Sequence, residues 1–247
     1  MITIENVYYS QEKIKSKSFD AYLPESKRGD AFIYFHGGGL TAGDKADAKP
    51  FACRLYDKNI ALFSVNYRMY PDNKYPDFIN DAAEAVKFIT KNLHLYGEYK
   101  RVFIGGSSAG GYLSMMLCFD KKYLLSCGVD PTDIYGYIHD AGQPTAHFNV
   151  LKERGFDERK IIVDDTCPLY HVGEEKIIPK MLFIVSDNDM PNRLEQTQLM
   201  IFTLKHFGFS DNISLKIMHG GHCEYLNKTV DGKNVFGEIV AEYILNN

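Results

Sequence analysis

The segment "RVFIGGSSAGGYL", residues 101–113, decides how the rest of the chain is interpreted. It begins as a short apolar run, which is typical of a buried strand, and continues into residues with helical spacing. Between the two halves, residues 106–110 fit the pattern G-x-S-x-G. At a sharp strand-to-helix turn this pattern presents its serine at the carboxyl edge of a sheet, and its glycines leave room for neighbouring backbone. In that register Ser108 is the candidate nucleophile, and Ser107 is a spacer that turns away from the site.

On this motif alone, a glycine-rich turn that binds a phosphate, or that binds nothing, remains an alternative. The segment lacks the lysine of a phosphate-binding P-loop and does not supply G-x-G-x-x-G in register. The helix expected after Ser108 would direct its free amides and the positive end of its dipole at the turn. The choice therefore depends on motifs elsewhere in the chain.

Short apolar runs alternate with segments of helical periodicity along the rest of the chain. The strand-like runs are residues 31–36, 61–66, 101–106, 134–139, 181–186 and 213–218, and the helix-like segments are 78–93, 108–119, 193–208 and 235–247. This alternation predicts a mainly parallel sheet with helices on both faces, in a single α/β domain over residues 1–247. The first 23 residues are expected to add an antiparallel strand hairpin.

Residues 140–178 interrupt this alternation, because they are polar and only weakly periodic. A connection of this length is usually functional, so we predict a loop or a short cap-like insertion within the domain.

Composition narrows the classes of function. The 247 residues are 45% apolar and 24% charged, as expected for a globular protein. The net charge of -4 and the lack of a Lys/Arg-rich cluster argue against a nucleic-acid or anionic-membrane partner. No signal-peptide or membrane-span pattern occurs, and the five cysteines have no paired spacing. We therefore predict a cytoplasmic protein.

A second glycine motif, "FHGGGL", follows the strand-like residues 31–36. Backbone amides of three consecutive glycines can face a ligand at the end of a strand. Together with the amide of Ala109 they can stabilise the oxyanion of a tetrahedral intermediate. A flexible glycine turn is the alternative. We expect His36 to hold this loop in place rather than to act as a base, because the base should come late in the chain.

Two carboxylates follow the strand-like residues 181–186, namely Asp187 and Asp189. An acid that orients a histidine belongs at this edge of the sheet, whereas the alternative for either residue is a helix N-cap. We favour Asp189 as the acid, and Asp187 is the second choice.

Two histidines follow the strand-like residues 213–218 in "IMHGGHCEYL". We favour His222 over His219 as the base, since a strand followed by Gly-Gly-His places an imidazole over the same edge. A metal site made of His219, His222 and Cys223 would need further ligands, so we expect no metal and no cofactor.

Taken together, these segments resemble the α/β-hydrolase superfamily, and in particular the carboxylesterases with an HGGG motif in the hormone-sensitive-lipase-like and small bacterial esterase branch. The resemblance covers nearly the whole chain from about Asp30. It is carried by "YFHGGGLTAGDK", "VNYRMYPDNKYPDFINDAAEAVKFI", "GGSSAGGYL" and "GGHCEY". The chain order of the motifs also agrees with this fold. The resemblance implies a catalytic triad of Ser108, Asp189 and His222. It also implies an oxyanion hole formed by the amides of Gly38, Gly39 and Ala109.

The sequence departs from this family at two residues and in the segment before the HGGG motif. Ser107 stands where relatives usually have aspartate or another residue, which leaves the G-x-S-x-G pattern intact, and the Gly often found three residues before the acid is here Ser186. Only a strand hairpin is expected before the HGGG motif, where larger relatives carry a helical cap. The "DAGQPTAHF" segment, residues 140–148, is then the expected wall of the site.

The resemblance implies a serine carboxylesterase that acts on short-acyl or sugar- or aryl-linked esters through an acyl-enzyme. An amidase or formamidase with the same triad is an alternative, and so is a non-catalytic receptor on the same fold. The expected partner is a small-molecule ester, with no nucleic acid and no membrane, and a homodimer is left open.

Overall fold

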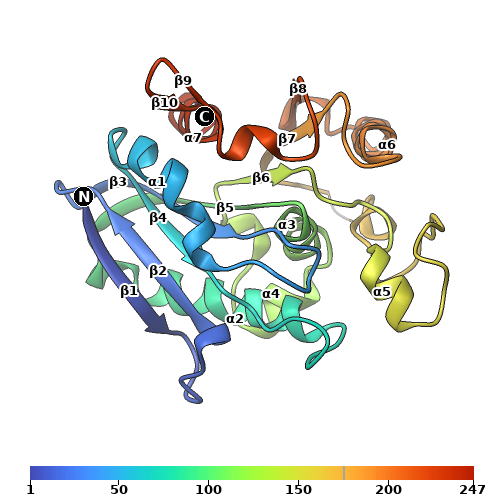
Figure 1. Cartoon of the computed structure of the whole chain (residues 1–247), viewed down its shortest axis with the longest axis horizontal. Helices are drawn as coiled ribbons and strands as arrows, with labels where there is room; N and C mark the ends of the chain where they lie inside the picture. Colours follow the sequence, from blue (N-terminus) through green and yellow to red (C-terminus); the bar gives the residue numbers. More distant parts are fainter. Residues whose placement is uncertain (175) are drawn as a thin grey trace.

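In the computed structural model, which describes residues 1–174 and 176–247, eight strands form one twisted sheet (Figure 1). They are β1 (Ile2–Tyr8), β2 (Ser18–Leu23), β3 (Arg28–Phe35), β4 (Ile60–Val65), β5 (Glu98–Ser107), β6 (Gly136–Asp140), β7 (Lys180–Ser186) and β8 (Ile213–Met218). Their order is β1-β2-β4-β3-β5-β6-β7-β8. β2 pairs antiparallel with β1 and β4, and all other neighbours are parallel. The predicted mainly parallel sheet with an N-terminal hairpin is confirmed.

Helices cover both faces of this sheet, as predicted. They are α1 (Lys49–Tyr56) and α7 (Val235–Asn246) on one face, and α2 (Asp77–Asn92), α3 (Ala109–Phe119), α4 (Lys122–Ser126) and α6 (Arg193–His206) on the other. Successive strand residues point to opposite faces. In β3, Phe32 and Tyr34 therefore join the core under α1 and α7, while Ile33 and Phe35 join the core under α2 and α3.

Some elements were not predicted. The short helices α1, α4 and α5 (Phe148–Glu153) span too few turns to give a clear apolar period. A small hairpin, β9 (Thr229–Val230) with β10 (Lys233–Asn234), precedes α7. β8 is an edge strand whose Leu215 and Ile217 are exposed, so its apolar character does not reflect burial under helices.

The long connection between β6 and β7 contains α5 and a 3-10 turn at Pro168–His171. Ala146, Leu151 and Cys167 form a small apolar cluster inside it. Residue 175, within the predicted insertion at 140–178, lies outside the described residues. That this segment is an insertion in a single domain stays a prediction.

None of the helices in the described part of the chain is long and apolar enough to cross a membrane.

Candidate active site

The turn between β5 and α3 places Ser108 at the carboxyl edge of the sheet. Ser108 has φ 54° and ψ -112°, a backbone conformation that is strained for a residue with a side chain. Its amide donates to the carbonyl of Asp140 at the end of β6, with 2.8 Å between the atoms. A Cβ on Gly110 would lie 1.9 Å from the carbonyl oxygen of Phe35, so the turn requires glycine there. The G-x-S-x-G pattern therefore forms the sharp turn that its spacing predicts.

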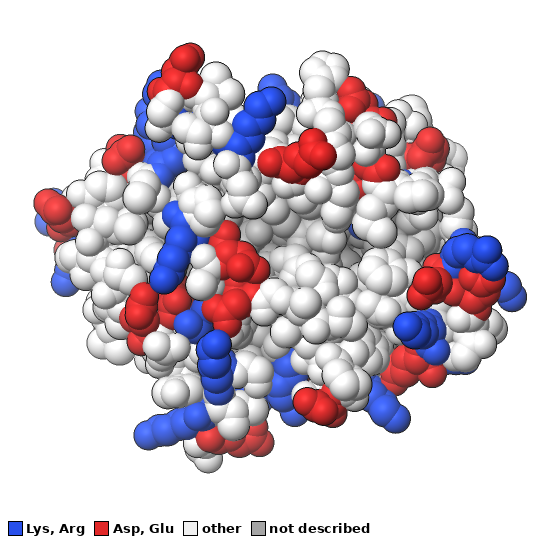
Figure 2. Space-filling model, in the orientation of Figure 1, with Lys and Arg blue, Asp and Glu red and all other residues white. Residues whose placement is uncertain are grey.

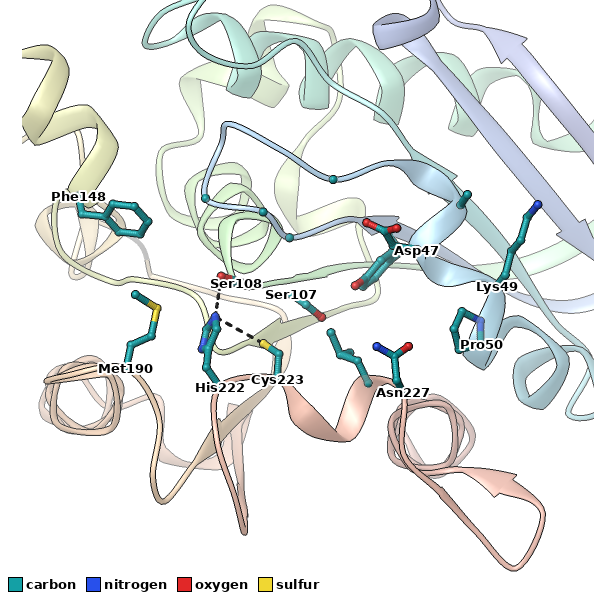
Figure 3. Close-up of a pocket in the computed structure, with 17 residues that line it drawn as sticks. Asp47, Lys49, Pro50, Ser107, Ser108, Phe148, Met190, His222, Cys223 and Asn227 are labelled. Atoms are coloured by element: carbon teal, nitrogen blue, oxygen red, sulfur yellow. Dashed lines mark hydrogen bonds between the residues drawn. The ribbon is translucent and has the colours of Figure 1, made fainter.

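The imidazole of His222 lies between Ser108 and Asp189. Its Nε2 is 2.8 Å from Ser108 Oγ (Figure 3), and its Nδ1 is 2.6 Å from Asp189 Oδ1. The Asp189 side chain is only 1% exposed and also accepts hydrogen bonds from the amides of Ser186 and Met190. Burial raises the pKa of Asp189, but the hydrogen bond with His222 and those from the amides outweigh it and hold the pKa below its usual value. Three residues that are far apart in sequence thus form one chain of hydrogen bonds.

The loops after β7 and β8 carry the acid and the imidazole, and they run side by side. The amide of Asp187 donates to the carbonyl of Met218 at 2.8 Å, which continues the pairing of the two strands. The hydroxyl of Ser186 donates to the carbonyl of Gly221 at 2.8 Å, one residue before the histidine. These bonds fix the imidazole over the carboxylate.

The second candidates of the sequence analysis form a pair of their own. His219 Nδ1 lies 2.5 Å from Asp187 Oδ2, and the His219 side chain is 95% exposed. This pair faces solvent and makes no contact with Ser108. No group of three or more His, Cys, Asp or Glu residues in the described ranges could hold a metal ion.

The glycine loop after β3 lines the same cavity as Ser108. Gly38 and Gly39 have φ of +106° and +65°, which glycine adopts without strain. Among the described residues, the amides of Gly38, Gly39 and Ala109 have no hydrogen-bond acceptor, so they can donate to a ligand. His36 stacks on Tyr67 with 4.5 Å between ring centroids, and its Nδ1 donates to the next carbonyl at 2.7 Å. Burial lowers the pKa of His36, and the side chain supports the loop.

The candidate active-site cavity has a volume of about 690 Å³. In the orientation of Figure 1, the surface of the molecule is hollowed near its centre (Figure 2). Phe148 and Met190 lie on one side of Ser108, and Asp47, Lys49 and Asn227 lie on the other (Figure 3). Phe148 belongs to the "DAGQPTAHF" segment that was expected to form a wall.

The sequence analysis expected Ser107 to turn away from the site, and this expectation was wrong. Its side chain is buried and lines the cavity beside Ser108. The sharp turn at Ser108 brings both serines to the cavity floor, and only Ser108 contacts the imidazole.

A buried polar pair under the site, Asp140 and Tyr225, was not identified from the sequence. The hydroxyl of Tyr225 donates to Asp140 Oδ1, and the Asp140 backbone carbonyl holds the amide of Ser108. Burial raises the pKa of Asp140 to about 7, although Ser107, Tyr225 and the charge of His222 favour its ionised form. A carboxylate at the end of the strand predicted at 134–139 was the signal available in the sequence.

Comparisons with known proteins identify the family of the chain and proteins that share its fold. A family model described as BD-FAE matches residues 19–203. The carboxylic ester hydrolase LipN of Mycobacterium tuberculosis is 38% identical over 92 residues, which cover 35% of this chain and 24% of LipN. The matched segments span only 24% to 30% of the first curated relatives.

Two solved structures share the fold. A truncated carbohydrate esterase from gut microbiota has a TM-score of 0.78 and 19% identity, with 100% of this chain and 96% of that chain covered. Butyrate-bound esterase Est2 of Thermogutta terrifontis has a TM-score of 0.76 and 17% identity, with 97% and 92% covered. These likenesses show the α/β-hydrolase fold that was predicted from the sequence.

Proposed function

The chain belongs to the BD-FAE family, and from that premise we propose that it is a carboxylic ester hydrolase with Ser108, His222 and Asp189 as its catalytic triad. The observation that carries the proposal is the chain of hydrogen bonds from Ser108 Oγ through both imidazole nitrogens to Asp189. A serine hydroxyl becomes an effective nucleophile when a neighbouring base takes its proton. The names of curated relatives, such as carboxylic ester hydrolase LipN, support the same class of activity.

The proposed reaction has two steps. His222 Nε2 accepts the proton of Ser108 as Oγ attacks the ester carbonyl, and the imidazolium then gives that proton to the leaving alcohol. Water then attacks the acyl carbonyl as the same imidazole takes its proton, and the imidazolium returns that proton to Ser108 Oγ as the carboxylic acid leaves. Asp189 fixes the tautomer with the proton on Nδ1 and stabilises the imidazolium.

The oxyanion of each tetrahedral intermediate is proposed to accept hydrogen bonds from the amides of Gly38, Gly39 and Ala109. Two observations support this role of the three amides. They lie beside Ser108, and they have no acceptor in the part of the chain that the structure describes. Each such donor contributes about 3–4 kcal/mol to lowering the barrier.

We propose a small ester with a short acyl group as the substrate. The cavity has an apolar side at Phe148 and Met190, and a polar side at Asp47, Lys49 and Asn227 that suits a hydroxyl-bearing alcohol. Two names support this choice, since one neighbour was solved with butyrate bound and another is described as a carbohydrate esterase.

The test is hydrolysis of 4-nitrophenyl acetate by the wild type and by Ser108→Ala. We expect kcat to fall by at least about 10³-fold, because the nucleophile is lost. Ser107→Ala is the matched control and should change kcat far less. A fluorophosphonate probe should label the wild type and Ser107→Ala but not Ser108→Ala. Turnover near the wild-type rate in Ser108→Ala would overturn the assignment, and faster hydrolysis of an N-formyl aryl amide than of the matching ester would favour the formamidase alternative.

A further inference from the structure

A second cavity, of about 290 Å³, lies next to the candidate active site. Phe148 and Met190 line both cavities, so the two spaces are neighbours across these side chains. Its walls are residues 158–161 of the β6–β7 connection and residues 190–193 at the start of α6. None of the catalytic roles proposed above uses this cavity.

The cavity contains a buried cation, Arg193, which is only 4% exposed. Its Nη1 donates to the carbonyl of Ala141 at 2.5 Å, and its Nη2 donates to Gln143 Oε1 at 3.4 Å. Both acceptors are uncharged, and no carboxylate of the described residues lies within ion-pair distance of the guanidinium. A buried charge without a charged partner is costly, so its retention requires a reason.

Asp189 does not supply the missing partner. Its oxygens already accept from His222 Nδ1 and from the amides of Ser186 and Met190. Its charge does raise the pKa of Arg193, but burial outweighs that attraction and the pKa stays lowered. The guanidinium therefore lacks full compensation in the protein alone.

Other donors point to the same kind of ligand. Gln196, also buried, uses its Oε1 to accept from Thr145, and its Nε2 has no acceptor among the residues described. Lys160 and Glu158, which have opposite charges, also line this cavity. Arg159 forms an ion pair with Asp157, with 2.5 Å between Nη2 and Oδ2. Arg193 and Gln196, which are buried members of the lining, thus offer hydrogen-bond donors and a positive charge.

We propose that this cavity is a subsite for a carboxylate group carried by the ester substrate, with Arg193 and Gln196 as its donors. The proposal rests on the ester hydrolase function above and names a substrate class, namely esters with a free carboxylate. A guanidinium presents parallel N–H groups that match the two oxygens of a carboxylate, and the bound anion would supply the counter-charge that Arg193 lacks.

The experiment compares two pairs of esters that differ in the carboxylate. One pair is mono-4-nitrophenyl glutarate and 4-nitrophenyl pentanoate, with the charge on the acyl side. The other is 4-acetoxybenzoate and its methyl ester, with the charge on the alcohol side. We expect the wild type to prefer the charged member of one pair by at least about tenfold in kcat/KM through a lower KM, and the favoured pair identifies the half that reaches Arg193.

In Arg193→Gln this preference should fall by about tenfold or more, and Arg193→Lys should retain part of it. Arg28→Gln, at an exposed arginine paired with Glu98, controls for the change in net charge. Equal losses for both members of each pair in Arg193→Gln would mean a purely structural role and would overturn the proposal. So would a wild type without preference in either pair.

Calorimetric titration with glutarate tests the carboxylate subsite separately from the ester hydrolase function. It also gives a result if Arg193→Gln does not fold. If the wild type hydrolyses none of the four esters, the proposed function fails, and the subsite is still tested by glutarate binding. We expect glutarate to bind the wild type and to bind Gln196→Leu at least about threefold more weakly. A wild type that does not bind glutarate, or equal binding by Gln196→Leu, would contradict the subsite.

Discussion

Two Asp–His pairs connect the loops after β7 and β8, and they differ in where they face. The carboxylate-to-imidazole distances are nearly equal, at 2.5 Å for Asp187 and His219 and 2.6 Å for Asp189 and His222. The Asp187 side chain is 41% exposed, whereas that of Asp189 is 1% exposed. Of the two imidazoles, only that of His222 contacts the hydroxyl of Ser108.

The difference shows that the hydrogen bond between carboxylate and imidazole is not what makes a site. Water and salt screen the outer pair, so its charge has little effect on neighbouring groups. The inner pair lies where the effective dielectric is low, and its carboxylate can stabilise an imidazolium as it forms. Burial and a serine hydroxyl within hydrogen-bond distance separate the two pairs.

The largest expected effect is the loss of the inner carboxylate. Asp189→Asn should lower kcat on 4-nitrophenyl acetate by about 10⁴-fold, because the amide favours the wrong imidazole tautomer and cannot stabilise the imidazolium. Asp187→Asn is the matched control, and we expect its kcat to stay within twofold of the wild type. If the two variants lost activity equally, the distinction between the pairs would be wrong.

The next effect concerns pH and the buried carboxyl under the inner pair. An aspartate in an unfolded chain has a pKa of about 3.9, and burial raises that of Asp140 to about 7. At pH values between these two pKa values, Asp140 is protonated in the folded state but not in the unfolded state. The stability that the protonated Asp140 contributes is therefore lost as the pH rises towards 7. Asp140→Asn has no such titration.

The measurement is urea unfolding of the wild type and Asp140→Asn at pH 5 and pH 8. Relative to the variant, the wild type should lose about 2–3 kcal/mol of unfolding free energy between these pH values. Burial lowers the pKa of His139 and His147 to about 3, which makes stability rise with pH, but both proteins contain them and the difference cancels that effect. A difference that does not change with pH would contradict the raised pKa.

The fold was predictable from periodicity, and the approximate place of the site from the motifs that follow the strands. Each motif follows a strand, and the carboxyl ends of parallel strands meet at one edge, so Ser108, Asp189 and His222 had to come close together. Which Asp–His pair turns inward was not fixed by periodicity, because the spacing allows both. In the structure the path of the two loops decides it, partly through the hydrogen bond from Ser186 to the Gly221 carbonyl.

Side-chain direction at the turn and in the long connection also escaped prediction. Ser107 was expected to face away, but the strained φ of Ser108 turns the backbone so that both serines line the cavity. The partner of Asp140 is Tyr225, 85 residues later, and no local pattern links residues so far apart. The predicted cytoplasmic location and the choice of a small-molecule partner stay predictions.

A smaller effect is expected from Tyr225, which ties the histidine loop to the floor of the site. Tyr225→Phe removes the hydroxyl that donates to Asp140 Oδ1 and leaves that oxygen without a partner. Because Tyr225 lies three residues after His222, we expect kcat to fall about tenfold while KM changes less than twofold, through a loss of positioning. Tyr170→Phe, at an exposed tyrosine, is the control. An unchanged kcat would mean that the other hydrogen bonds of the loop, such as the one from Ser186 to the Gly221 carbonyl, hold it without Tyr225.

The smallest effect is expected at the outer pair itself. His219→Ala removes an exposed imidazole but leaves the hydrogen bond from the Gly220 amide to Asp187 Oδ1, at 3.0 Å, so the loop keeps its path. We expect kcat/KM to change less than twofold at every pH between 5 and 9, in low and high salt alike, since water already screens this pair. A tenfold loss in a variant that unfolds at the wild-type urea concentration would show that His219 reaches the substrate. The loop would then have a second arrangement in which the outer histidine turns inward, and exposure in one structure would no longer separate the two pairs.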